Sequence, residues 1–190
     1  MMTVFKNFLL PFVLGVFVVI ISFPLVSKAD FWGGGKTWDG HARVEYTPSV
    51  ASYGYTNIYN AAVNNWRGLS SKVTITVGVG SHPNDDKYHV AETSTPNLLG
   101  RIVPYNGSEV GSTNYWAYVR VYIYDNTFNN FRFDEDERIG TATHEIGHSL
   151  KLAHPLSKSV SAVMHQYDDR DGVVSPTSYD ISELRRKWGN

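Results

Sequence analysis

Apolar and polar residues alternate along four stretches of the chain, and this alternation predicts strands. The stretches are 42–46, 72–79, 98–104 and 116–124. In the last of them, Ala117, Val119, Val121 and Ile123 share one face, while tyrosines and an arginine share the other. This stretch is therefore expected to be an amphipathic strand.

Helical spacing of apolar residues predicts a first helix over 52–66, with Gly68 as its stop. Four acidic residues, 134–137, begin a segment that runs to about Leu152, and acidic side chains favour a helix start. A last helix is predicted over 179–188, because basic residues fill its final turns. Residues 30–40 are rich in glycine and are predicted to be an extended lead-in to the first strand. The polar, turn-rich stretch 80–97 is predicted to be a long loop.

The first 29 residues have the layout of a signal peptide. Lys6 precedes an almost unbroken apolar stretch over 8–26, and Ser27 and Ala29 are small residues where a signal peptidase reads. We expect cleavage before Asp30, export, and one mature domain over 30–190. The alternative is an uncleaved anchor, in which residues 8–26 hold the chain to the outer face of the membrane.

Composition narrows the classes of partner and of metal ligand. Among 190 residues, 17 are basic and 18 acidic, with no basic run that could neutralise phosphates, so nucleic acid is not an expected partner. The chain has no cysteine, so any zinc must be held by histidines and carboxylates. That absence in an exported chain leans towards a bacterial source. We expect a monomer without a membrane partner after cleavage.

The candidate chemistry lies in the predicted helix after residue 134. His144 and His148 are four apart, so both imidazoles project from one helix face and can reach one metal ion. Their neighbour Glu145 can take a proton from water at the metal instead of binding the metal. His154 reaches the same ion only if the helix ends and the chain turns back near Lys151. Three nitrogens would then surround zinc and leave a fourth position for water.

The chain resembles the metzincin zinc peptidases, whose motif H-E-x-x-H-x-x-G-x-x-H is followed by a methionine-containing turn. The corresponding segments here are HEIGHSLKLAHP and SAVMHQY. The resemblance implies that His144, His148 and His154 bind zinc, that Glu145 is the general base, and that Met164 lies beneath the metal. It also implies an α+β fold, with a twisted, mostly parallel five-stranded sheet, an antiparallel edge strand, an active-site helix and a C-terminal helix.

Within the clan, the matrixin-like group is the most similar branch. The segment LLGRIVPY resembles its edge strand, and SPTSYDISELRRKWG resembles its last helix. Two positions depart from the pattern. Lys151 stands where the family has a glycine at positive φ, which costs a lysine about 1 kcal/mol. Pro155 follows the third histidine, whereas matrixins usually carry serine at that position. A proline there is more similar to the serralysin branch.

The resemblance also implies where substrate binds. A peptide would pair antiparallel with the edge strand, along Leu99, Gly100, Arg101, Ile102 and Val103. Tyr167 is expected to be a wall of the specificity pocket.

Several polar residues allow two interpretations. His82, Asp85, Asp86, His89 and Glu92 invite a structural calcium or zinc site, but a solvated polar loop is favoured, because no fixed ligand spacing is recognisable. His165 has no assigned role. Asp180 begins the last helix and either caps it or accepts hydrogen bonds from the methionine turn.

These observations predict a secreted zinc-dependent endopeptidase that acts on peptides or proteins. The alternative is a binding or regulatory module that keeps the fold without cleaving. Lys151 is the best support for that alternative, and Glu145 argues against it, because a binding module has no need of a carboxylate there. A processing enzyme with one protein substrate is a further alternative.

Overall fold

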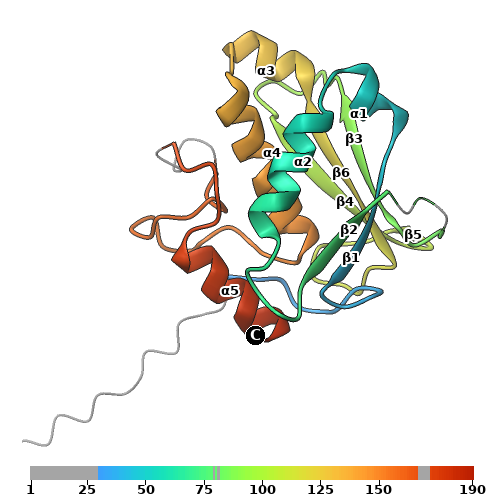
Figure 1. Ribbon diagram of the computed structural model, residues 1–190, viewed down its shortest axis with the longest axis vertical. Coiled ribbons are helices and arrows are strands. Elements are labelled where there is room, and N and C mark those ends of the chain that lie inside the picture. Colours follow the sequence, from blue (N-terminus) through green and yellow to red (C-terminus); the bar gives the residue numbers. More distant parts are fainter. Residues whose placement is uncertain (1–29, 79, 81, 167–171) are drawn as a thin grey trace, which may run out of the picture.

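The computed structural model describes residues 30–78, 80, 82–166 and 172–190, and Figure 1 shows how their elements are arranged. The described residues form six strands: β1 (His41–Tyr46), β2 (Thr74–Val77), β3 (Asp86–Ala91), β4 (Gly100–Asn106), β5 (Ser108–Glu109) and β6 (Tyr118–Tyr124). The same residues form five helices: α1 (Pro48–Ser52), α2 (Thr56–Trp66), α3 (Asp125–Phe131), α4 (Glu135–Ser149) and α5 (Ser178–Trp188). Within these ranges, no helix is both long and apolar enough to cross a membrane.

The strands form one sheet in the order β2-β1-β3-β6-β4-β5. The pairs β1/β2, β1/β3 and β3/β6 are parallel, and β4 runs antiparallel to β6. The predicted mixed α+β fold, with a mostly parallel sheet and an antiparallel edge strand, is confirmed. A sixth strand joins the expected five, because β5 pairs with the last two residues of β4.

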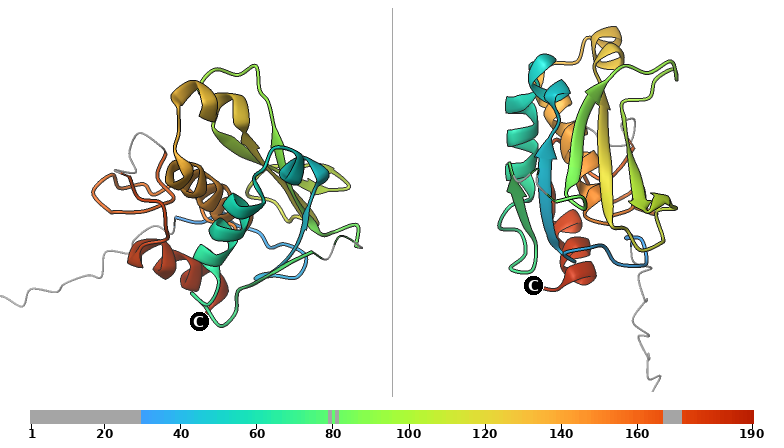
Figure 2. Two further views of the ribbon diagram at one scale, coloured as in Figure 1. Left: turned by 45° about the horizontal axis from the view of Figure 1, so that its top comes forward. Right: turned by 90° about the vertical axis from the view of Figure 1, so that its right-hand side faces the viewer.

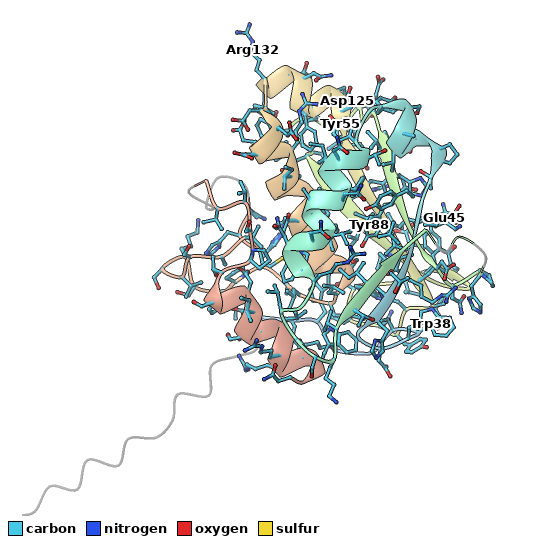
Figure 3. All side chains as sticks on the ribbon, viewed as in Figure 1. Trp38, Glu45, Tyr55, Tyr88, Asp125 and Arg132 are labelled. Atoms are coloured by element: carbon cyan, nitrogen blue, oxygen red, sulfur yellow. The ribbon has the colours of Figure 1, made fainter. Side chains whose placement is uncertain are left out.

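Helices α2 and α4 cover one face of the sheet, as the edge-on view in Figure 2 shows. The core lies between these layers and holds large aromatic side chains, of which Tyr59, Trp66 and Tyr88 are fully buried. Tyr88 points from β3 towards α2 (Figure 3). The Trp66 indole donates to the carbonyl of Thr143 at 2.8 Å, which ties α2 to α4.

The predicted loop over 80–97 is wrong in its middle, because Asp86–Ala91 forms the central strand β3. Every second residue of β3 faces the core, as in other strands. Two of these residues are Tyr88 and Val90, but the third is Asp86, which is 2% exposed. Its carboxylate accepts from the equally buried Lys36 at 2.5 Å and from the backbone N–H of Val119 at 3.0 Å. The strand was not predicted because a carboxylate at a core position breaks the alternation of apolar and polar residues.

Two helices differ from their predicted forms. The helix predicted over 52–66 begins later, as α2 at Thr56, and a separate short helix, α1, ends at Ser52, with Gly54 at a φ of 80° between them. Helix α3 follows β6 directly in a stretch predicted as no element. Its first residue, Asp125, accepts a hydrogen bond from Tyr55 at 2.6 Å, and the two side chains lie together in Figure 3.

The other two helices match their predictions closely. Asp134 and Glu137 form a reciprocal capping box at the start of α4, and the acidic first turn is as expected. Thr177 and Asp180 form the same arrangement at the start of α5. Helix α4, which carries His144, Glu145 and His148, therefore begins at a capped N-terminus and ends next to these residues.

Candidate metal centre and its cleft

Helix α4 presents His144, Glu145 and His148 on its buried side, where each side chain is less than 9% exposed. The four-residue spacing places the two imidazoles one helical turn apart, with ring centroids separated by 4.5 Å. Both rings lie on the side of α4 that faces the cleft beside β4. His144 and His148 therefore share one helix face, as their spacing predicted, and the neighbouring Glu145 lines the same cleft.

The turn that brings His154 back begins at Lys151, which adopts the expected left-handed conformation with a φ of 73°. The Lys151 N–H donates to the His148 carbonyl at 2.9 Å, and the Leu152 N–H donates to the Gly147 carbonyl at 3.1 Å. This pair of bonds is the Schellman arrangement that closes helices, usually with glycine at the left-handed position. Lysine therefore makes the turn that the family makes with glycine.

The three histidines converge through their Nε2 atoms. His154 Nε2 lies 3.1 Å from that of His148 and 3.2 Å from that of His144. Nitrogens that share a tetrahedral zinc ion lie about 3.3 Å apart. Within the described part of the chain, these residues are the one group of histidine and carboxylate side chains close enough to hold a metal ion.

Backbone carbonyls determine which nitrogen of each ring faces that point. His144 Nδ1 donates to the Val163 carbonyl at 2.9 Å, and His148 Nδ1 donates to the Leu152 carbonyl at 2.8 Å. Both Nε2 atoms therefore carry lone pairs, which is the tautomer of a metal ligand. Burial and the neighbouring His154 lower the pKa of His148 to about 3, and burial lowers the pKa of His154. Neutral imidazoles whose lone pairs converge fit a bound cation.

Met164, which the resemblance implied to lie beneath the metal, packs against Gly147 of α4 and is 2% exposed. A Cβ added at Gly147, between the two helical histidines, would collide with the Met164 sulfur, so glycine permits this packing. The Asp180 carboxylate accepts from the backbone N–H groups of Val163 at 2.9 Å and Met164 at 3.2 Å. It also takes part in the capping box, so both interpretations of Asp180 are correct.

Trp32 is a site residue that the sequence analysis missed. Its ring stacks on that of His148 with centroids 4.9 Å apart, and its backbone N–H donates to the Lys151 carbonyl at 2.8 Å. The neighbouring Phe31 forms an antiparallel bridge with Leu152. The one available signal was an aromatic pair, Phe31 and Trp32, immediately before the three glycines of the lead-in.

Glu145 lies between the helix and the edge strand. A Cβ added at Gly100 would lie 2.7 Å from its Cγ and 2.8 Å from its Oε1, so a side chain at this position of β4 would displace the carboxylate. A cleft of about 640 Å³ runs here. Its lining includes all three histidines, Glu145, Trp32, Thr141, Phe131, Gln166 and the stretch 97–102.

The outer edge of β4 borders this cleft. The Leu99 carbonyl accepts from the Tyr124 N–H at 2.9 Å, and Arg101 pairs with Tyr122 in register. Because backbone groups alternate along an antiparallel ladder, those of Gly100 and Ile102 point away from β6. Strand β5 pairs only with Tyr105 and Asn106, so within the described residues these outward groups have no strand partner.

The other predicted site residues separate into two groups. Leu99, Gly100, Arg101 and Ile102 line the cleft, whereas Val103 is 4% exposed and packs in the core. Tyr167 lies outside the described residues. His165 is buried, and its Nε2 donates to the Val160 carbonyl at 2.7 Å, away from the three converging nitrogens.

The residues suggested for a second metal do not form a site. Asp85 accepts from Arg43 at 2.8 Å, and Asp86 accepts from Lys36, so both carboxylates already have cationic partners. His82 contributes its backbone N–H to Asp85, and His89 stacks on Tyr122, with ring centroids 4.7 Å apart. The alternative of a structural calcium or zinc ion therefore finds no support among the described residues, and the favoured solvated loop is wrong for Asp85 and Asp86, which are both buried.

Comparisons with known proteins leave the family open. The chain matches no family model, and no curated protein matches it by sequence. One similar solved structure is that of High choriolytic enzyme 1, a hatching enzyme zinc-protease from the medaka fish Oryzias latipes. The two sequences are 10% identical, the match covers 82% of this chain and 92% of that chain, and the TM-score is 0.41.

Proposed function

We propose that the chain is a zinc-dependent endopeptidase of the metzincin type, with matrixin-like features. His144, His148 and His154 would hold zinc, and Glu145 would act as general base. The observation that carries this proposal is the meeting of three imidazole nitrogens beside a buried carboxylate, in a cleft bordered by an open strand edge.

The donor set favours zinc over other metals. Three neutral imidazoles suit zinc, and sites with three protein ligands keep a position open for water or substrate, as catalytic zinc sites do. All three histidines line the cleft, so a metal held by them would be accessible to a substrate in the cleft. Zinc bound there would supply a Lewis acid that activates water and polarises a peptide carbonyl.

Glu145 has the position required for proton transfer. It follows the ligand His144 in sequence, is 5% exposed, and lines the same cleft. Its carboxylate would take a proton from the attacking water and deliver it to the amine of the leaving peptide. A carboxylate that only supported the fold would not need to line the cleft next to the metal ligands.

The edge of β4 supports a peptide substrate. An extended chain that runs antiparallel to β4 can exchange backbone hydrogen bonds with Gly100 and Ile102 and place a peptide bond beside Glu145. Backbone pairing binds a chain with little regard to its sequence. The cleft therefore favours an endopeptidase over an enzyme for a small molecule.

The rival interpretation, a binding module without activity, depended on Lys151. Its left-handed backbone closes α4 with both Schellman hydrogen bonds, so the lysine does not disturb the turn before His154. Export and cleavage before Asp30 remain part of the proposal on the sequence of residues 6–29 alone, which lie outside the described structure.

The experiment that tests the proposal is Glu145→Gln in the chain from Asp30 onward. We expect at least about a 100-fold loss of kcat on casein, because general acid–base groups contribute that much, while the zinc content stays at the wild-type level. The matched control is Glu135→Gln, an exposed position in the first turn of the same helix, which should leave both quantities unchanged. Equal casein hydrolysis by the wild type and the Glu145 variant would refute the proposed role.

A further inference from the structure

The Lys151 ammonium lies in a site made by the protein itself. The residue has no exposed surface, and its Nζ donates to the carbonyls of Asn114 at 2.5 Å and of Gly33 and Ser112 at 3.2 Å. The same atom lies 3.7 Å from the centroid of the Trp116 ring. Burial, with Lys187 and Lys36 nearby, lowers the pKa of this amine to about 7. Three carbonyl acceptors nevertheless require the three N–H donors that only the ammonium has, and an aromatic face also favours a cation.

These carbonyls come from two segments that belong to no helix or strand. Gly33 is in the lead-in, and Ser112 and Asn114 are in the connection between β5 and β6. The two segments lie very close, because a Cβ added at Gly34 would meet the Asn114 carbonyl oxygen at 2.7 Å. A cation between them offsets the repulsion of carbonyl oxygens that point at one place.

Lys151 also connects this cation site to the candidate zinc ligands. Its backbone N–H bonds to His148, and its carbonyl accepts from Trp32, whose ring stacks on His148. Trp32 in turn meets the edge of Trp116, with ring centroids 6.1 Å apart. The ammonium, the two tryptophans and the imidazole therefore form one continuous contact chain.

We propose that Lys151 is a positioning residue whose ammonium acts as an internal cation, holding the lead-in and the 110–116 connection against the turn that places His148 and His154. The inference rests on the proposed function, because it assigns a role in holding the zinc ligands. Lysine at this position is then the anchor of the site, not a tolerated substitute for glycine.

The two views predict opposite results for Lys151→Gly. If lysine were merely tolerated, glycine would relieve the left-handed strain, stabilise the turn, and leave zinc affinity unchanged. If the ammonium anchors the site, the variant loses three hydrogen bonds and the contact with Trp116. Zinc should then bind about 10-fold to 100-fold more weakly, as when other outer partners of metal ligands are removed.

The experiment measures the zinc dissociation constant by competition with a chromophoric chelator. Lys151→Met accompanies the glycine variant, because it keeps an unbranched side chain and the left-handed strain while removing the charge and the donors. Both variants should weaken zinc binding. Val44→Ala, a fully buried position in β1, is the control for general destabilisation and should keep wild-type affinity.

Chemical rescue gives a readout that a merely structural role would not move. Millimolar butylammonium should restore zinc affinity in Lys151→Gly, whereas tetramethylammonium, which has no N–H donor, should not. Unchanged zinc affinity in both Lys151 variants would overturn this inference alone. A wild type that binds no zinc would instead overturn the proposed function, and this inference with it.

Discussion

One nitrogen of His144 and one of His148 each donate a hydrogen bond to a backbone carbonyl, and these bonds orient the two rings. The carbonyls of Val163 and Leu152 each accept from an Nδ1 atom, so the opposite nitrogens of His144 and His148 face the metal position as acceptors. Such outer partners orient imidazoles and raise their strength as ligands. At the scale of one residue, the site is organised by backbone groups that no motif contains.

His89 shows how burial changes a histidine without a metal role. It stacks on Tyr122, and its Nε2 is buried with no hydrogen-bond partner among the described residues. Burial, with Arg120 and Lys87 nearby, lowers its pKa from 6.5 to about 4. The folded state therefore disfavours the protonated ring.

This shift makes stability depend on pH. Between pH 6.5 and pH 4 the unfolded chain takes up a proton at His89 that the folded chain does not, so stability falls as the pH falls through this range. Because the ring is only partly buried, we expect His89 to account for about 1 kcal/mol of the loss. Urea unfolding at both pH values should show a smaller loss in His89→Phe, which keeps the stacking. An equal loss in the variant would contradict this assignment.

Individual residues differ in how far the sequence predicted them. The spacing of His144 and His148 is enough, because helix geometry alone puts them on one face. The left-handed turn at Lys151 was also expected, since His154 cannot otherwise reach the ion. Trp32 and the ammonium site were not, because both depend on contacts between segments far apart in the chain.

Among the elements, α5 supports the segment beneath the metal position. Asp180, in its first turn, is 1% exposed and accepts from Val163, Met164 and Thr177. One carboxylate thus caps α5 and holds the methionine turn, whose Val163 carbonyl accepts from His144. The C-terminal helix is therefore part of the site's support.

Asp180→Asn tests that support. An amide in place of the carboxylate turns an NH₂ group towards at least one backbone N–H, and a lost bond to a buried charged acceptor costs about 2–3 kcal/mol. We expect the free energy of unfolding in urea to fall by that amount. Asp136→Asn, an exposed acidic residue in the first turn of α4, should change it by less than about 0.5 kcal/mol. A stable Asp180 variant would mean that the turn is held by other contacts.

The elements that the sequence missed have physical reasons for being missed. In strand β3 a core position is occupied by Asp86, whose carboxylate is buried. A pattern of apolar and polar residues assigns an aspartate to the solvent-exposed side, so it does not predict a strand there. Helix α3 contains three asparagines, which have low helix propensity, and ends at Arg132 in a left-handed conformation. By contrast, α4 was predicted because its acidic first turn and the four-residue spacing of its histidines both indicate a helix.

For the whole molecule, the arrangement of layers explains where the cleft lies. Helices α2 and α4 cover one face of the sheet (Figures 1 and 2). Strand β5 leaves the first part of the outer edge of β4 unpaired, and that part borders the cleft beside α4. The lead-in, the connection after β5 and the segment after α4 close the end near the three histidines. The three histidines, the carboxylate of Glu145 and the open edge therefore meet in one place, although they come from separate parts of the chain.

The proposed catalytic role of zinc is tested by the rate of casein cleavage as zinc is added back to the chelated chain from Asp30 onward. We expect negligible cleavage without metal, a linear rise with added zinc, and a break at one zinc per chain. Cleavage that is undiminished in the metal-free chain, or no cleavage at one bound zinc per chain, would contradict that role.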